Sequence, residues 1–187
     1  MKDLYSFTTD EKSHKVFYDS VIDAYHNIFE KVGLGDRTFL TFASGGAFAQ
    51  FSHEFQTLSE AGEDTIYLDR KNKIAINEEV MTDDVISELK LDKKNLEKVS
   101  AIETGNIFSF GDMKSKELGL NFKDESGAEK YVILGSYGIG ITRLMGAIVE
   151  TLADDKGIVW PTSVTPFHIH LITIGNNATL QKKSKNL

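Results

Sequence analysis

The stretch Gly135-Ser136-Tyr137-Gly138-Ile139-Gly140-Ile141-Thr142-Arg143-Leu144 decides the fold of this chain. An apolar run at 131–134 precedes it, and apolar residues at helical spacing follow it over 141–152. These patterns predict a strand, a glycine turn at 135–140 and a helix. Glycines let the backbone approach a ligand closely, and the start of a helix presents unpaired N–H groups to an anion. The stretch is therefore the first candidate for a phosphate site.

Arg143 bears on this candidate because it lies in the first turn of the predicted helix. A cation there faces the positive end of the helix dipole, which costs about 0.3–1 kcal/mol, so its position indicates an anionic ligand nearby. By itself, Gly138-Ile139-Gly140 is more typical of a tight strand-to-helix connection than of a ligand site. Arg143 by itself also fits a solvated surface residue.

Upstream of this stretch the pattern mixes strands with one long helix. Apolar residues at three- and four-residue spacing predict a helix over 10–32, with a capping box from Thr8 to Glu11 and an end at Gly33. Alternating or continuous apolar runs predict strands at 4–7, 38–42, 51–58, 65–68, 107–110 and 120–123.

Residues 69–100 differ in composition from the rest, because apolar residues thin out and charges cluster. We predict a peripheral insertion with one or two short helices. Its acidic runs fit a solvated face, and we assign them no chemistry.

Two other segments carry polar side chains on predicted strands. Alternation over 51–56 places His53 on one face and Glu54 and Gln56 on the other, where the latter two could line a polar substrate site. His53 fits a hydrogen-bonded, half-buried histidine slightly better than a ligand-binding one.

The second segment is Glu103-Thr104-Gly105-Asn106. A carboxylate, a hydroxyl and an amide so close together suit Mg²⁺ held jointly with the phosphates of a nucleotide. A turn in which Thr104 and Asn106 bond their own backbone fits the composition equally well.

Composition excludes several classes of protein. The 187 residues include no cysteine, which excludes disulfide scaffolds, thiolate zinc sites and cysteine nucleophiles and fits a cytoplasmic location. No apolar run approaches the roughly 20 residues of a spanning helix, so we expect no membrane partner. The net charge of −7 lacks the basic field of an autonomous nucleic-acid binder.

Both prolines of the chain, Pro161 and Pro166, follow residue 160 and mark a boundary. We predict one α+β domain over 1–160. Residues 167–174 predict a buried strand, followed by a polar tail to 187. One strand with a tail cannot bury a core, so 161–187 is expected to be a linker and the start of a truncated second domain.

Five ordered blocks together resemble bacterial-type prolyl-tRNA synthetases, a family of class II aminoacyl-tRNA synthetases. They are Met1–Phe7, Ser52–Phe55, Gly105–Phe108, Gly135–Leu144, and Trp160-Pro161 with Pro166-Phe167. The resemblance implies an antiparallel sheet flanked by helices, incomplete at its N-terminus because the family's dimer-forming segment and first phosphate-binding arginine lie upstream. It also implies that 69–100 replaces an editing domain and that 161–187 begins an anticodon-binding domain.

The resemblance further implies an activity and residue roles. The activity is ATP-dependent activation of proline to prolyl-adenylate, with Mg²⁺, followed by transfer to tRNA(Pro); the family's full-length members form homodimers. Arg143 would act catalytically on an ATP phosphate. The ATP and Mg²⁺ side would further include Glu103, Thr104, Asn106, Gly138 and Gly140, and the proline pocket would include Asp3, His53, Glu54 and Ser136.

Two of these positions depart from the family pattern, since many relatives carry Cys at Ser136 and His at Asn106. We expect the isolated chain to be weak or inactive as an enzyme. The alternatives are a non-catalytic, synthetase-like binding or regulatory module, and a fragment that does not fold alone.

Overall fold

The computed structural model describes residues 1–46, 50–172 and 174–185. Seven strands form one sheet in the order β1-β9-β6-β3-β2-β5-β4. They are β1 (Lys2–Thr8), β2 (Thr38–Ser44), β3 (Phe51–Leu58), β4 (Asp64–Asp69), β5 (Ile74–Asn77), β6 (Glu97–Gly111) and β9 (Ile133–Ile139). All pairs are antiparallel except β2 with β5. The predicted α+β class is confirmed.

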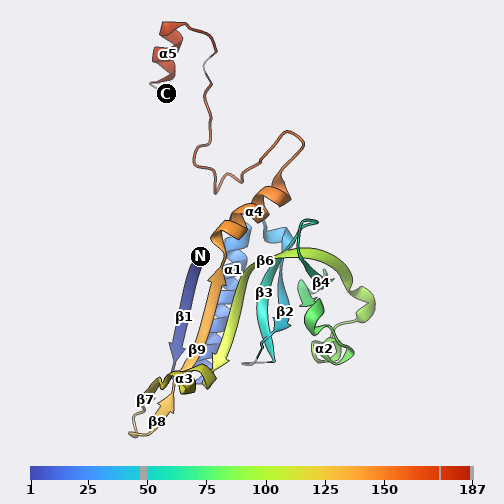
Figure 1. Ribbon diagram of the computed structural model, residues 1–187, viewed down its shortest axis with the longest axis vertical. Coiled ribbons are helices and arrows are strands. Elements are labelled where there is room, and N and C mark those ends of the chain that lie inside the picture. Colours follow the sequence, from blue (N-terminus) through green and yellow to red (C-terminus); the bar gives the residue numbers. More distant parts are fainter. Residues whose placement is uncertain (47–49, 173, 186–187) are drawn as a thin grey trace.

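Helices and a small hairpin complete the fold (Figure 1). The helices are α1 (Glu11–Lys31), α2 (Asp83–Glu88), α3 (Met113–Leu118), α4 (Ile141–Leu152) and α5 (Ala178–Ser184), with 3-10 turns η1 (Gly35–Arg37), η2 (Glu78–Val80) and η3 (Lys93–Asn95). The strands β7 (Asn121–Lys123) and β8 (Glu129–Tyr131) pair only with each other. No helix in the described ranges is long and apolar enough to cross a membrane.

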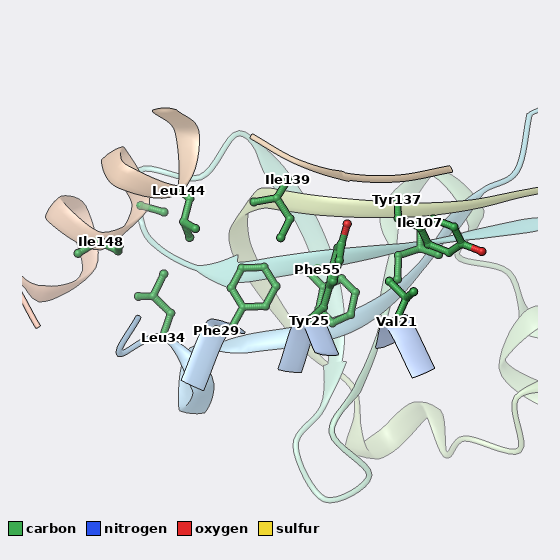
Figure 2. Close-up of a cluster of buried hydrophobic side chains, with 11 residues drawn as sticks. Val21, Tyr25, Phe29, Leu34, Phe55, Ile107, Tyr137, Ile139, Leu144 and Ile148 are labelled. Carbon is green, nitrogen blue, oxygen red and sulfur yellow. The ribbon is translucent and has the colours of Figure 1, made fainter. Parts of the chain in front are cut away.

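The main core lies between α1 and the sheet. Val21, Tyr25 and Phe29 follow one another at four-residue intervals, so they lie on one face of α1, and all three are buried. The Phe55 ring from β3 stacks on that of Phe29, with centroids 5.3 Å apart. Figure 2 shows Leu144 and Ile148 of α4 closing the same cluster at one end.

The start of α1 differs from the predicted capping box. Asp10 is the N-cap, because its Oδ1 accepts a hydrogen bond from the backbone N–H of Ser13 at 2.8 Å. Thr8 still belongs to β1, where its hydroxyl bonds the carbonyl of Ile133. The strand therefore continues past the position that the capping box required.

The predicted glycine turn at 135–140 is wrong, because residues 133–139 form strand β9 in the sheet. The glycines serve close packing instead. A Cβ on Gly135 would lie 2.4 Å from the Tyr137 hydroxyl and 2.8 Å from the Ser6 hydroxyl. Glycine inside a strand commonly marks such a close approach. The helix that follows, α4, begins at Ile141 as predicted.

Residues 69–100 are only partly peripheral, which corrects the sequence prediction. They contribute α2 and two 3-10 turns, but β5 lies within the sheet between β2 and β4, and β6 already begins at Glu97. β4 also pairs with the first half of β6, so five strands close around a second cluster containing Phe39, Ile66 and Leu68. These pairings are long-range, so local composition did not indicate them.

The C-terminal prediction also fails in part. In the described part of 167–174 no strand forms, and Phe167, Ile169 and Ile174 are largely exposed. An apolar run alone does not make a strand when no partner strand is available for hydrogen bonding. The chain runs away from the sheet after α4 and continues to α5 (Figure 1). Pro161 packs closer in, since it lies against Gly33.

Candidate active site

A row of paired residues crosses four neighbouring strands of the sheet. Glu54 on β3 pairs with Asn106 on β6, Asn106 with Gly138 on β9, and Gly138 with Asp3 on β1. Directly paired residues point to the same face. With strands about 4.8 Å apart, the row extends for roughly 14 Å. Four residues from distant parts of the sequence thus lie side by side, as the proposed pockets required.

Arg143 lies beside this row, at the start of α4. Its Nη1 donates to the backbone carbonyl of Glu103 at 3.1 Å and lies 3.4 Å from the Glu103 carboxylate. Gly140 caps the helix without a side-chain hydrogen bond to the first turn. The first N–H groups of a helix have no intrahelical partner, so they and Arg143 together form an anion-binding end.

A cleft of about 400 Å³ connects these groups. It is lined by Met1, Glu103, Thr104, Gly105, Asn106, Gly138, Gly140, Ile141, Thr142 and Arg143. All six residues predicted for the nucleotide side therefore border one cleft. Gly138 keeps it open, because a Cβ there would lie 3.2 Å from Oδ1 of Asn106.

Thr104 takes part differently from the prediction. Its hydroxyl donates to the carbonyl of Phe55 at 2.9 Å and lies 3.1 Å from the Thr57 hydroxyl, and the residue is fully buried. A bulge between Phe55 and Gln56 accompanies this arrangement. The Thr104 hydroxyl is thus committed to the inside of the sheet and is not directed at a ligand.

Glu54 borders a second, acidic cavity of about 500 Å³ that shares Glu103 with the first cleft. Its lining residues are Glu54, Glu63, Asp64, Thr65, Asn77, Glu78, Glu79 and Glu103. Burial, with the nearby charges of Glu103 and Asp64, raises the pKa of Glu54 to about 7. Hydrogen bonds from Gln56 and Asn77 oppose this rise. The site therefore contains a carboxyl that is partly protonated near neutral pH.

The two other residues predicted for the amino-acid side occupy the β9 end of the same face. Asp3 is exposed at the edge strand and is paired with Gly138. Ser136 is paired with Phe108 and with Tyr5, two residues along β9 from Gly138. Because strand side chains alternate, Ser136 and Gly138 share a face and lie about 7 Å apart.

His53 does not join these residues, because it points to the opposite face of the sheet, under α1. Its Nδ1 lies 2.8 Å from the Tyr18 hydroxyl, which in turn donates to the carbonyl of Ile107 at 3.1 Å. Burial lowers the pKa of His53 to about 4. His53 is the hydrogen-bonded, half-buried histidine that the sequence favoured. It lies on the face of the sheet opposite to the row.

Sequence reasoning missed Asn77 and Tyr18, and it placed Gln56 beside Glu54 on an open face that could bind a substrate. Gln56 is fully buried, and its Nε2 donates to Glu54 at 2.9 Å and to Asp64 at 2.7 Å. Asn77, in the segment to which we assigned no chemistry, donates to Glu54 at 3.3 Å. Tyr18 lies within the predicted helix and was given no role at the site. No local signal marked Asn77 or Tyr18, since the Asn77 contact depends on β5 joining the sheet and the Tyr18 contacts depend on α1 packing against β3 and β6.

The oxygens facing the cleft are chemically suited to Mg²⁺. Glu103 offers a carboxylate and Asn106 an amide oxygen, and Nδ2 of Asn106 donates to Glu103 at 3.1 Å, which orients both groups. Among the described residues, no three His, Cys, Asp or Glu side chains are grouped to hold a metal by themselves. Mg²⁺ is commonly bound by one or two carboxylates together with substrate phosphates, and this donor set fits that mode.

Curated proteins of similar sequence are proline–tRNA ligases. A proline–tRNA ligase of Wolbachia sp. subsp. Drosophila simulans (strain wRi) is 36% identical over 195 residues, covering 96% of this chain and 45% of the relative. A proline–tRNA ligase of Anaplasma marginale (strain St. Maries) is 34% identical over 187 residues, covering 93% and 44%. The chain thus spans less than half the length of these curated relatives.

The fold is also similar to that of a solved structure. The crystal structure of prolyl-tRNA synthetase from Cryptosporidium parvum, complexed with L-proline and AMP, superposes with a TM-score of 0.59 at 19% identity. The match covers 88% of this chain and 26% of that one. The family model for the class II tRNA synthetase core domain (G, H, P, S and T) matches residues 1–152, and the chain therefore belongs to this family.

Proposed function

We propose that this chain forms part of the amino-acid activation site of a proline–tRNA ligase. The observation that carries the proposal is the shared position of Glu103. It binds Arg143 in the anion-binding cleft and also lines the acidic cavity that contains Glu54. An anion site and a cation site that meet at one residue suit a nucleotide and an amino acid that react with each other. The similarity to proline–tRNA ligases supports proline as the amino acid.

The nucleotide would bind at the start of α4. Arg143 and the free N–H groups of the first turn would hold the phosphates of ATP, and Met1 and Ile141 offer exposed apolar surface beside them. Glu103 and Asn106 would hold Mg²⁺, which would neutralise phosphate charge.

Proline would lie along the row toward β3 and β1. Its secondary ammonium group needs carboxylate or carbonyl acceptors, which Glu54 and Asp3 offer at the two ends of the row. Asn106 and Ser136 offer neutral polar groups between them. A cationic ligand beside Glu54 would favour its ionised form and lower its pKa.

The chemistry requires positioning and neutralisation of charge more than proton transfer. A carboxylate oxygen of proline attacks the α-phosphorus of ATP; the new O–P bond forms as the bond to the β,γ-pyrophosphate breaks, which gives prolyl-adenylate. A terminal ribose hydroxyl of tRNA(Pro) then attacks the prolyl carbonyl and AMP leaves. Arg143 would stabilise the negative charge on the phosphates. We place the enzyme in the cytoplasm and expect the full-length protein to form homodimers.

The test is thermal unfolding of the chain with a non-hydrolysable prolyl-adenylate analogue and Mg²⁺. A ligand that binds only the folded state raises the Tm. We expect a rise with the prolyl analogue, a smaller rise with the threonyl analogue, and loss of the rise in Arg143→Ala. Equal rises with both analogues, or none with either in a chain that unfolds cooperatively, would contradict the proposal.

A second measurement separates binding from catalysis. Pyrophosphate exchange with proline reports adenylate formation directly. Binding of the prolyl analogue without exchange would favour the non-catalytic binding module over the enzyme for this chain.

A further inference from the structure

A separate open cleft of about 630 Å³ lies between the end of α1, the turn η1 and the turn that joins β4 to β5. None of its lining residues borders the nucleotide cleft or the acidic cavity. Its volume falls in the range of small-molecule sites, roughly 300–1,000 Å³. Its floor is apolar, with Phe39, Leu40 and Ile74 from the neighbouring strands β2 and β5.

One wall of this cleft is negative. Glu30 and Asp36 border it, and neither side chain has a hydrogen bond or ion pair within the described part of the chain. The fold makes room for the Glu30 carboxylate, because a Cβ on Gly35 would lie 1.9 Å from its Oε2. Gly35 does not adopt a positive φ, so the turn itself does not require glycine. The glycine instead allows the carboxylate to lie at this wall.

The opposite wall is positive. Lys73 and Arg70 both belong to the β4–β5 turn, which Asp69 fixes by accepting the backbone N–H of Asn72 at 3.0 Å. Arg70 is paired with Glu97, whereas Lys73 has no carboxylate partner among the described residues. Lys73 lines the cleft together with His26, whose pKa is lowered by burial and, to a lesser degree, by the charge of Lys73.

We propose that this cleft binds a short apolar peptide or a similar zwitterion, whose two charges lie at opposite ends of an apolar body. Its carboxylate pairs with Lys73, its ammonium pairs with Glu30, and its side chains cover Leu40 and Ile74. A ligand with only one charge would leave one wall unpaired.

The experiment titrates the chain with four probes by calorimetry: Leu-Leu, acetyl-Leu-Leu, Leu-Leu amide and acetyl-Leu-Leu amide. Leu-Leu should bind most tightly, and each blocked end should weaken binding by about threefold, as for solvent-accessible ion pairs. Backbone amide chemical shifts should move at Leu40 and Ile74 and not at Gly140.

Two variants assign the ends. Lys73→Gln should remove the difference between Leu-Leu and Leu-Leu amide, and Glu30→Gln should remove the difference between Leu-Leu and acetyl-Leu-Leu. Lys71→Gln in the same turn and Glu60→Gln outside the cleft should change neither. Failure of Leu-Leu to bind, equal binding of all four probes, or variants that leave the differences intact would overturn the proposal.

Discussion

Arg143 at the start of α4 is bound by Glu103 of β6, through the backbone carbonyl at 3.1 Å and the carboxylate at 3.4 Å. The side chain is half exposed and the contact is long for an ion pair, so it contributes little to stability. The contact with Glu103 instead fixes the orientation of the Arg143 side chain. The guanidinium group is held at the cleft that Asn106 and Gly138 also line, where the proposed phosphates would lie.

The first prediction concerns this cation. Arg143→Lys keeps the charge but loses the planar set of donors, and Arg143→Ala loses both. We expect Arg143→Ala to weaken AMP binding by about tenfold or more, corresponding to the loss of one charged hydrogen bond, and Arg143→Lys to lie between this variant and the wild type. Calorimetric titration with AMP measures the effect. Unchanged affinity in Arg143→Ala would remove the residue from the site.

The second prediction contrasts two glycines of β9. A Cβ on Gly138 would meet only the flexible end of Met1 at 2.8 Å and Asn106 at 3.2 Å, whereas a Cβ on Gly135 would meet the buried Tyr137 hydroxyl. Gly138→Ala should therefore fold with little loss of stability and lose the Tm rise with the prolyl-adenylate analogue. Gly135→Ala should lower the free energy of unfolding by about 1–3 kcal/mol. Urea unfolding of both variants checks this, and the reverse order of stability would contradict it.

The third prediction follows from the pKa of Glu54, which is about 7 in the folded chain against 4.5 for the free side chain. The folded state favours the protonated form, so this group's contribution to stability falls as pH rises from about 4.5 to 7. Glu54→Gln removes the titration and keeps an acceptor for Gln56. Over this pH range, we expect the free energy of unfolding of Glu54→Gln to rise by about 2 kcal/mol relative to that of the wild type. Urea unfolding at pH 5 and pH 8 measures the gain, and a constant difference at both pH values would refute it.

The fourth prediction has the opposite sign. The pKa of His53 is about 4 in the folded chain against 6.5 for the free side chain, so folding favours the neutral ring. The contribution of His53 to the free energy of unfolding is at its full value above pH 6.5 and is lost as pH falls toward 4. His53→Asn keeps a donor for the Tyr18 hydroxyl without titrating. The acid-induced loss between pH 6.5 and 4.5 should be smaller in the variant than in the wild type, by about 2 kcal/mol. Parallel curves for the two proteins would show that His53 does not titrate in this way.

The fifth prediction tests the cap of α1. Asp10 accepts the N–H of Ser13, and this hydrogen bond lowers the pKa of its carboxyl. Asp10→Ala should lower the Tm by about 2–4 °C, the effect of one lost N-cap in a chain of this size. Thr8→Ala, at the position that the capping box favoured, should lower it less. Thermal unfolding followed by circular dichroism compares the two, and a larger effect at Thr8 would restore the capping box.

Much of the fold was predictable because it follows from the local spacing of apolar residues. The helical spacing of apolar residues such as Val21 and Tyr25 predicted α1, and the alternation around His53 and Glu54 predicted that these two side chains lie on opposite faces of β3. Arg143 in a first helical turn indicated an anion site without any knowledge of its neighbours. These signals depend only on the geometry of a single helix or strand.

The predictions that failed depended on a partner elsewhere in the chain. The glycine-rich residues 135–140 looked like a turn because nothing local shows that Ser6 of the neighbouring strand β1 packs closely against Gly135. The apolar segment 167–174 looked like a strand, but a strand requires a neighbour to satisfy its backbone. β5 is short and lies in a charged region, and it joins the sheet because β2 and β4 offer it hydrogen bonds on both sides.

The sequence by itself determined the long helix, most of the strands, the family resemblance and the residue types of the candidate site, because these can be read from periodicity and short motifs. Only the tertiary structure decided how these residues meet. It placed Glu54, Asn106, Gly138 and Asp3 in one row, turned the Thr104 hydroxyl inward, and buried Glu54 near other carboxylates, which together raise its pKa. The reason is that strand register and burial arise from contacts between segments as much as a hundred residues apart. The local sequence does not show these contacts.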